Sequence, residues 1–254
     1  MEKIETPKRI FKYTSFDIAK IIVSSSCIKF SHPADFNDPF DCDIDLLDFQ
    51  FNSEAELNDT IKAEIVLLKD RFKDTPGFTE LSRDDSFWAR GYRETQIGKI
   101  KSCRICCFSL VNNSILMWSH YAEKHFGICL EFDNYISPRF VNLSEKDISE
   151  GIVGYSEYER INYMNNEKKY SLFKLFLSKS VSWNHEQEYR MILLNGKDEI
   201  QKFYKPFLSA IYFGLRTTDS ERNEIVSLCL AQGYNDMKYF NTKKNSLSIQ
   251  FYKI

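Results

Sequence analysis

Long hydrophobic runs and an excess of charge of one sign are both missing from this sequence of 254 residues. No apolar stretch approaches the roughly 20 residues that a membrane-spanning helix needs, and the start of the chain lacks the apolar segment of a signal peptide. The 34 basic and 36 acidic residues nearly balance, so nothing global favours a nucleic acid or an anionic membrane as a partner. We therefore predict a cytoplasmic protein with no membrane partner.

Repeats, low-complexity tracts and Gly/Ser-rich linkers are also absent, and only 9 glycines and 6 prolines interrupt the chain. The aromatic content, with 21 Phe and 14 Tyr, is enough for a large core. We predict a single domain over residues 1–254, with a helical insertion at residues 53–100. Ser53 and Glu56 predict a capping box at the start of this insertion. The apolar stripe of its first helix consists of Ile61, Ile65, Leu68 and Phe72. A second, more polar helix is predicted at residues 87–100.

Cysteine gives little evidence of a special site. The seven cysteines are odd in number and mostly lie in apolar stretches, which is typical of reduced thiols in a core. Cys103, Cys106 and Cys107 form a lone Cys-x-x-Cys-Cys with no second pair and no His at ligand spacing. The sequence therefore predicts no metal site at these cysteines.

The hydrophobic pattern predicts an α+β fold, in which a mixed or antiparallel central sheet is covered by helices. Strands and helices are mixed without a regular β-α-β alternation, which favours this class. The predicted strands lie at residues 10–14, 28–31, 104–108, 127–132, 152–155, 186–193 and 210–213, with a final hairpin pairing 237–240 with 247–251. The predicted helices lie at residues 18–23, 115–125 and 170–177, with another, capped by Thr218 and Glu221, that ends at Leu230.

The most informative segment is Trp183-Asn-His-Glu186-Gln-Glu188-Tyr-Arg190. Successive side chains of a strand alternate between faces, so we expect Glu186, Glu188 and Arg190 on one face. Neighbouring carboxylates are suited to acid/base chemistry or to stabilising a cation. The alternative is that Arg190 simply neutralises both glutamates on a solvated face.

Two further motifs contain candidate binding residues. Asn37-Asp38-Pro39 is a turn, flanked by Phe36 and Phe40, that either shapes a cleft or is only structural. In Met117-Trp118-Ser119-His120-Tyr121-Ala122, the side chains of Ile115, Trp118 and Ala122 fit a buried helical stripe. His120 and Tyr121 lie off that stripe, which makes them the better functional candidates.

Together with three further motifs, these segments resemble, in this order, the bacterial domain of unknown function 2971 family over roughly residues 11–214. The further motifs are Phe11-Lys12-Tyr13, Ile28-Lys29-Phe30-Ser31-His32-Pro33 and Cys107-Phe108-Ser109, and Gly127 follows the helix motif. The motif order is also similar to that of the ADP-ribosyltransferase fold, in which two early strands hold NAD and a late strand supplies a catalytic glutamate. The resemblance implies that Glu188 grips the ribose 2′-hydroxyl as positive charge develops, and that Glu186 activates the acceptor. The NAD contacts that it implies are Lys12, Tyr13, Ser31, Phe36, Asn37, Asp38, Trp118, His120, Tyr121 and Arg190.

The implied function is that of an NAD-dependent ADP-ribosyltransferase-like enzyme that modifies a protein or nucleic acid, as a bacterial toxin or anti-phage effector would. A second hypothesis is a Mg²⁺-dependent nuclease-like effector. Its acidic residues would be Asp41, Asp43, Asp45, Glu186 and Glu188, together with Lys179. A third hypothesis is a non-catalytic interaction module in which all these motifs are structural.

Overall fold

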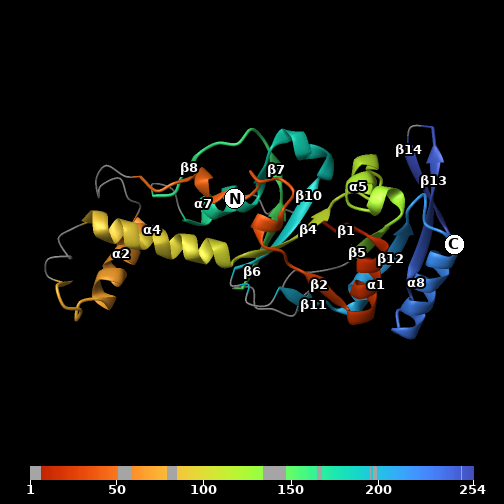
Figure 1. The fold of residues 1–254 in the computed structure, drawn as a ribbon, viewed down its shortest axis with the longest axis horizontal. Coiled ribbons are helices and arrows are strands. Elements are labelled where there is room, and N and C mark those ends of the chain that lie inside the picture. Colours follow the sequence, from red (N-terminus) through yellow and green to blue (C-terminus); the bar gives the residue numbers. More distant parts are fainter. Residues whose placement is uncertain are drawn as a thin grey trace. The chain divides into compact units, whose positions relative to one another are not determined.

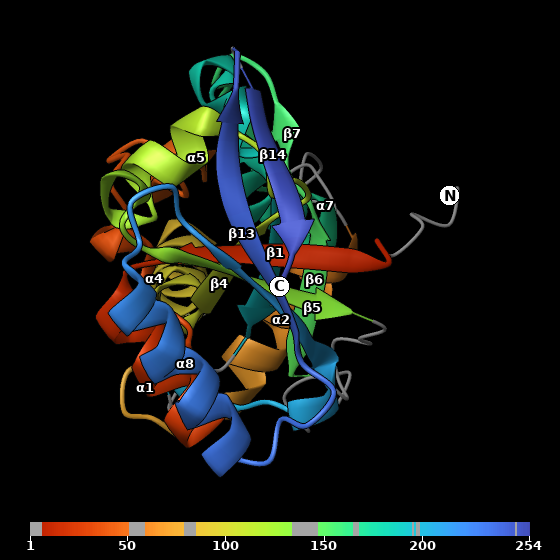
Figure 2. The ribbon, with the colours of Figure 1, turned by 90° about the vertical axis from the view of Figure 1, so that its right-hand side faces the viewer.

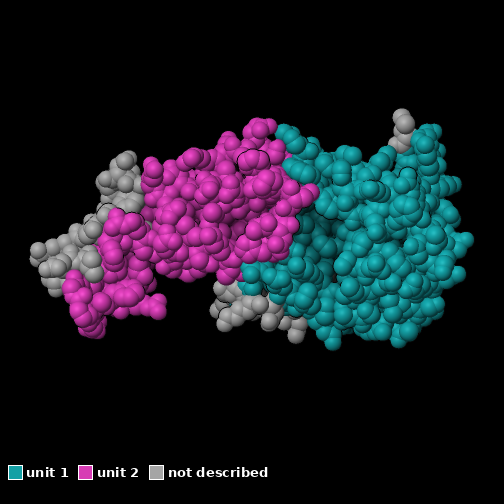
Figure 3. Space-filling view, in the orientation of Figure 1, with its two compact units in different colours: residues 1–31, 104–153, 181–254 teal, residues 32–103, 154–180 magenta. Residues whose placement is uncertain are grey.

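The computed structural model describes residues 7–50, 59–78, 85–133, 147–164, 168–194, 196, 199–246 and 248–254 (Figure 1). The chain splits into two compact units, which are described separately (Figure 3). Unit 1 contains residues 1–31, 104–153 and 181–254, and unit 2 contains residues 32–103 and 154–180. The single domain expected from the sequence stays a prediction, and the predicted capping box of Ser53 and Glu56 lies outside the described residues.

The described part of unit 1 is built on an eight-stranded sheet with the order β14-β13-β12-β5-β1-β4-β10-β6. Neighbouring strands pair antiparallel, except for the parallel pair of β12 and β13, which are connected through helix α8 (Asp219–Ala231). This arrangement confirms the predicted α+β class with a mixed sheet. The strands are β1 (Arg9–Thr14), β4 (Arg104–Ser109), β5 (Ile128–Asp133), β6 (Ile148–Ile152), β10 (Glu188–Leu193), β12 (Leu208–Phe213), β13 (Lys238–Asn245) and β14 (Ser248–Lys253).

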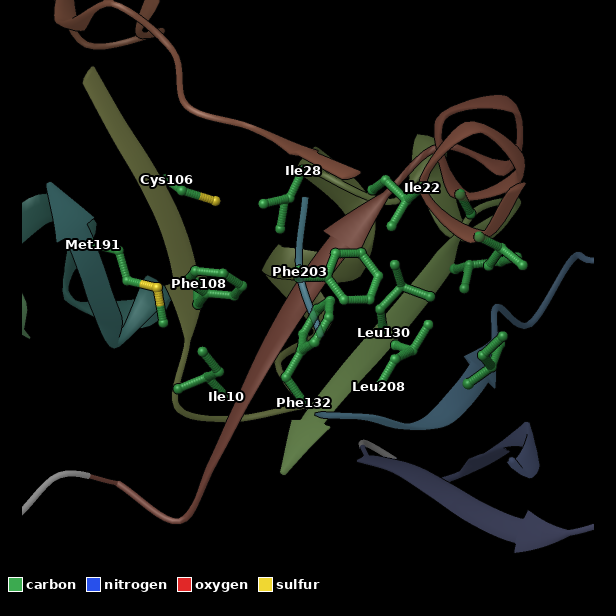
Figure 4. Packing of buried hydrophobic residues seen from close by; sticks show 14 of the residues in the cluster. Ile10, Ile22, Ile28, Cys106, Phe108, Leu130, Phe132, Met191, Phe203 and Leu208 are labelled. Atoms are coloured by element: carbon green, nitrogen blue, oxygen red, sulfur yellow. The ribbon is translucent and has the colours of Figure 1, made fainter. Parts of the chain in front are cut away.

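One face of this sheet packs against α8 and α1 (Phe16–Ser25), which lie side by side in Figure 2. Local signals set the starts of both helices: Ser15 caps α1, and the predicted capping box of Thr218 and Glu221 is present at the start of α8. The core between the helices and the sheet contains buried side chains from alternate strand positions (Figure 4). Among them are Ile10, Ile22, Phe108, Leu130, Phe132 and Met191.

The opposite face of the sheet is covered by α5 (Ile115–His120). Tyr13 of β1 packs edge-on against Trp118 of α5, with ring centroids 5.3 Å apart. Helix α5 is shorter than the predicted helix at 115–125, because Glu123, Lys124 and His125 all have positive φ and form only a 3₁₀ turn. A small second sheet in unit 1 pairs β2 (Cys27–Lys29) with β11 (Ile200–Lys202).

Unit 2 contains the predicted helix pair of the insertion, α2 (Asp59–Arg71) and α4 (Asp85–Ser102), and also α7 (Lys168–Phe176). Ile61 and Ile65 of α2 are buried as predicted, whereas Phe72 is exposed because α2 ends one residue before it. The short strands of unit 2 form two parallel pairs. These are β3 (Leu47–Asp48) with β8 (Ile161–Asn162), and β7 (Gly154–Tyr155) with β9 (Ser178–Lys179).

Candidate functional site

The two glutamates of the Glu-x-Glu motif do not lie on one strand. Glu186 is the last residue of a 3₁₀ helix, η5 (Val181–Glu186), and β10 begins only at Glu188. Between them, Gln187 has φ of 43° and donates its backbone N–H to Asn184 O at 3.2 Å. The prediction that Glu186 shares a strand face with Glu188 and Arg190 is therefore wrong, because a left-handed residue breaks the alternation.

Glu188 and Arg190 form a buried ion pair on β10. Arg190 Nε donates to Glu188 Oε2 at 2.7 Å, and Nη2 donates to Oε1 at 3.2 Å. Their relative exposures are 4% for Glu188 and 0% for Arg190. Neutralisation by Arg190 was one prediction from the sequence, but the pair lies in the interior and not on the solvated face that this prediction assumed. Since both carboxylate oxygens of Glu188 accept from the guanidinium, this acid is bound within the fold.

Glu186 is held differently, by contacts that link η5 to α5 and β4. The Tyr121 hydroxyl, at the end of α5, donates to Glu186 Oε1. Ser109 of β4 is fully buried, and its hydroxyl donates to Glu186 O at 2.7 Å. At the start of α5, the hydroxyl of the N-cap Ser114 donates to His185 O at 3.4 Å. These contacts fix the position of a carboxylate that is only 2% exposed.

A row of four rings leads to this carboxylate. Trp183 and His185 have ring centroids 6.1 Å apart, and His185 and His120 have centroids 6.3 Å apart. His120 and Tyr121 follow at 6.4 Å, and Tyr121 bonds to Glu186. The ring of His120 belongs to an exposed residue, and the other three residues are partly exposed. We call Trp183, His185, His120 and Tyr121 the ring row.

Sequence reasoning selected His120 and Tyr121 but missed Trp183 and His185 as site residues. A signal for them was present, because rings at alternate positions directly precede Glu186. What the sequence did not reveal is that a segment more than 60 residues earlier supplies the other half of the ring row.

The remaining predicted contacts in unit 1 have structural partners. Lys12 lies on the opposite sheet face from Tyr13, because they are neighbours on β1. Its ammonium donates to Cys107 O at 2.9 Å and lies 5.6 Å from the Phe108 ring centroid. The Tyr13 hydroxyl donates to Val111 O at 3.0 Å, and burial raises the pKa of Tyr13. Lys12 and Tyr13 therefore cannot line the same side of the sheet.

Trp118 and Ser31 also make bonds that belong to the fold. The indole N–H of the fully buried Trp118 donates to Asn112 O at 2.8 Å. Ser31 exchanges two backbone hydrogen bonds with Ile105, at 2.9 and 2.8 Å. Trp118 supports α5 beneath the ring row, and Ser31 extends the sheet pairing of β4.

The predicted contacts Phe36, Asn37 and Asp38 belong to unit 2. The turn at Asp38 is formed as expected: its Oδ1 accepts from Phe40 N at 3.0 Å. Its Oδ2 accepts from the Tyr158 hydroxyl at 3.0 Å. Asp38 is buried, so these bonds give it a structural role in unit 2.

The acids of the magnesium hypothesis have other partners. Asp41 lies 3.4 Å from the Lys179 ammonium, and both side chains are buried. Asp43 Oδ1 accepts from Asp45 N at 3.0 Å. Within the described residues, no group of three or more His, Cys, Asp or Glu is placed to hold a metal ion. In the same part of the chain, no helix is long and apolar enough to cross a membrane.

A second buried acid in unit 1, Glu131 of β5, was not selected from the sequence. The Tyr212 hydroxyl donates to Glu131 Oε2 at 2.6 Å, and the Ser209 hydroxyl donates to Oε1 at 3.2 Å. Burial raises the pKa of Tyr212, and the Glu131 carboxylate raises it further. Glu131 is 3% exposed and satisfied by neighbours, which marks it as part of the interior of the sheet.

Fold and site together define an α+β protein with a mixed sheet, in which the carboxylate of Glu186, at the end of η5, is held beside a row of aromatic rings. Residues 117–191 match the model of the family described as Protein of unknown function (DUF2971). The predicted resemblance to this family is therefore confirmed for that segment, which contains the whole ring row, Glu186 and Glu188. No curated protein and no solved structure matches the chain.

Proposed function

We propose that this protein is an NAD-dependent ADP-ribosyltransferase-like enzyme whose reactive site is Glu186 and the ring row. The observation that carries the proposal is that the four rings of the ring row lie one after another in space and that the last, Tyr121, bonds to the Glu186 carboxylate. Planar heterocycles bind against aromatic side chains, and a small number of placed polar groups sets their orientation. NAD contains two such heterocycles and a ribose hydroxyl next to the bond that breaks.

The chemistry needs few groups. When the C1′–N bond of NAD breaks, the positively charged nicotinamide ring takes the bonding electron pair and leaves as a neutral molecule, so it requires no proton. The ribose is left as an oxocarbenium ion. A carboxylate that accepts a hydrogen bond from the 2′-hydroxyl binds this cation more tightly than the ground state. Glu186 is the acid next to the ring row, and we assign it this role.

The acceptor then attacks C1′ of the ribose and loses a proton. Imidazole is the side chain most often used to accept a proton near neutral pH, and the exposed His120 is next to Tyr121 in the row. With a protein or nucleic acid as the acceptor the product is a modified macromolecule, and with water it is free ADP-ribose. An effector role, as a toxin or in anti-phage defence, would depend on the first of these reactions.

Glu188 has a different role in this proposal from the one that the resemblance implies. Both of its oxygens accept hydrogen bonds from Arg190, so we assign it to holding the start of β10, directly after Gln187. It is a positioning residue for Glu186.

A second candidate function is a non-catalytic interaction module. The buried ion pair of Glu188 and Arg190 favours it, because one of the two candidate catalytic acids is used within the fold. In that case the ring row would be a contact surface, and no variant of Glu186 would change any reaction.

The test is NAD turnover by the full chain, followed as release of nicotinamide and ADP-ribose. Glu186→Gln should lower turnover by about a hundredfold or more, which is the usual loss when one well-placed electrostatic group is removed. Trp183→Leu should raise KM, whereas Tyr252→Leu, which removes an exposed ring on β14, is the matched control and should change nothing. Chelation of metals should leave turnover intact.

Two outcomes would overturn the proposal. Absence of nicotinamide release from the wild-type chain, with and without a lysate as the source of acceptor, would favour the interaction module. Turnover that survives Glu186→Gln but not Glu188→Gln, at equal thermal stability, would return the catalytic role to Glu188.

A further inference from the structure

Unit 2 contains a cavity of about 380 Å³ that is lined by none of the residues of the site around Glu186. Its walls come from the segment His32–Ile44, the end of α4 and the end of α7. The volume lies within the range of roughly 300–1,000 Å³ in which small-molecule sites fall. Most of the lining is apolar, and its main members are Pro33, Phe36, Pro39, Ile44, Ile100 and Phe176.

One part of the wall is acidic and consists of Asp41, Cys42 and Asp43. The charge of Asp41 is balanced by the buried Lys179, at 3.4 Å, and the Cys42 thiol donates to Asp41 Oδ1 at 3.2 Å. Asp43 is different. Its Oδ1 accepts only a backbone N–H, from Asp45, and no described cation lies within ion-pair distance of its carboxylate. Asp43 therefore contributes a negative charge to the cavity. The other charged lining residue outside the pair of Asp41 and Lys179 is Lys101, which is exposed and forms no ion pair with Asp43.

The imidazole of His32 does not offset this charge. Its Nδ1 accepts a hydrogen bond from Ala34 N at 3.0 Å, so that nitrogen carries no proton. Its Nε2 lies 3.1 Å from Lys101 O and must be the protonated nitrogen that donates to this carbonyl. His32 is thus held as the neutral tautomer, and it presents a ring surface to the cavity.

Backbone geometry at the acidic wall is unusual as well. Cys42 has φ of 58°, a left-handed conformation that a residue with a side chain adopts at a cost. Such strained residues gather at ligand-binding positions, because the surrounding structure has to hold them there. Here the left-handed residue separates Asp41 from Asp43, so that one acid pairs with Lys179 and the other does not.

We propose that this cavity binds a small, mostly apolar ligand with one positive charge. Such a ligand has one ring or branched alkyl group and one protonated amine or amidine. The apolar part would pack against Phe36 and Phe176, and the cationic group would pair with Asp43. A carboxylate ligand of the same size would be disfavoured by the same charge. This site is independent of NAD turnover in unit 1.

Three probes that differ only in the polar group test the charge preference: 2-phenylethylamine, 2-phenylethanol and phenylacetate. Each is titrated into the full chain and followed by ligand-observed NMR. We expect the amine to bind at least tenfold more tightly than the alcohol, and phenylacetate to bind more weakly than both. A tenfold ratio corresponds to about 1.4 kcal/mol.

Variants locate the binding. Asp43→Asn keeps an oxygen for the Asp45 N–H but removes the charge, so amine and alcohol should then bind equally. Asp45→Asn is the matched control, because Asp45 is an exposed acid two residues away that does not line the cavity. Phe36→Ala should weaken all three probes. The proposal fails if the amine shows no saturable binding, if phenylacetate binds as well as the amine, or if Asp45→Asn has the effect of Asp43→Asn.

Discussion

The ion pair of Glu188 and Arg190 allows a sharp test of how β10 is stabilised. Arg190→Met keeps a side chain of similar length but leaves the Glu188 carboxylate, with 5% side-chain exposure, without the guanidinium that donates to both its oxygens. Removing one partner of a buried ion pair costs about 3–5 kcal/mol. For a unit of this size, each kcal/mol shifts the thermal midpoint by about 2–4 °C, so we expect a drop of roughly 6–20 °C.

The matched variant is the double substitution Glu188→Met with Arg190→Met. Replacing a whole buried pair by apolar side chains of similar volume is often neutral or stabilising, so this variant should recover most of the loss. Urea unfolding of the wild type, both single variants and the double variant gives the coupling energy of the pair. A cost below about 1 kcal/mol for Arg190→Met, or a double variant as unstable as the sum of the singles, would refute the reasoning.

The double variant also bears on function. If Glu188 acts only through the position of β10, a folded Glu188→Met/Arg190→Met protein should retain NAD turnover within about tenfold. If Glu188 touches the ribose, turnover should fall as far as in Glu186→Gln, whatever the stability.

Three further predictions concern other parts of unit 1 and the α4 helix. Gly127→Ala should destabilise the fold by more than about 3 kcal/mol in urea unfolding, because the added Cβ would lie 2.2 Å from a backbone oxygen. Gly98→Ala is the contrasting variant: it adds a Cβ in open space on α4 and should stabilise the fold by about 0.5–1 kcal/mol. Tyr212→Phe removes the donor to the buried Glu131 and should cost about 1.5–3 kcal/mol in the same assay; no change would show that this bond contributes nothing. Burial lowers the pKa of His125, so the unfolded chain binds a proton more readily and stability should be lost as pH falls below about 6.5. In His125→Asn, where Asn tolerates the φ of 71°, the melting temperature should depend less steeply on pH.

Several elements could be predicted because their signals are local. The capping box of Thr218 and Glu221 needs only four consecutive residues, and it marks the start of α8 as expected. Alternation along β10 puts Tyr189, Met191 and Leu193 on the face opposite Glu188 and Arg190, where they are part of the core. Likewise, the first helix of the insertion follows from its apolar spacing, and Ile61 and Ile65 of that helix are buried.

The candidate site could be predicted only in part. His120, Tyr121 and Glu186 were recognised as candidates from their types and their departure from a buried stripe. The relative placement of the two glutamates was not predicted, because one left-handed residue, Gln187, ends the alternation, and Glu186 then bonds to Tyr121. Nothing in the local sequence marks Gln187 for this, since Gln has no preference for positive φ.

Sequence by itself determined the α+β class, most of the helices and strands, and which side chains could carry chemistry, because periodicity, caps and residue types act over a few neighbouring positions. Tertiary structure alone decided which of those side chains meet. It brought Trp183 and His185 to His120, bound Glu188 to Arg190 in the interior, and put Lys12 on the opposite face of the sheet from Tyr13. The physical reason is that burying a charged or polar side chain costs free energy unless hydrogen-bonding partners surround it. Which segments supply those partners depends on how the whole sheet is paired.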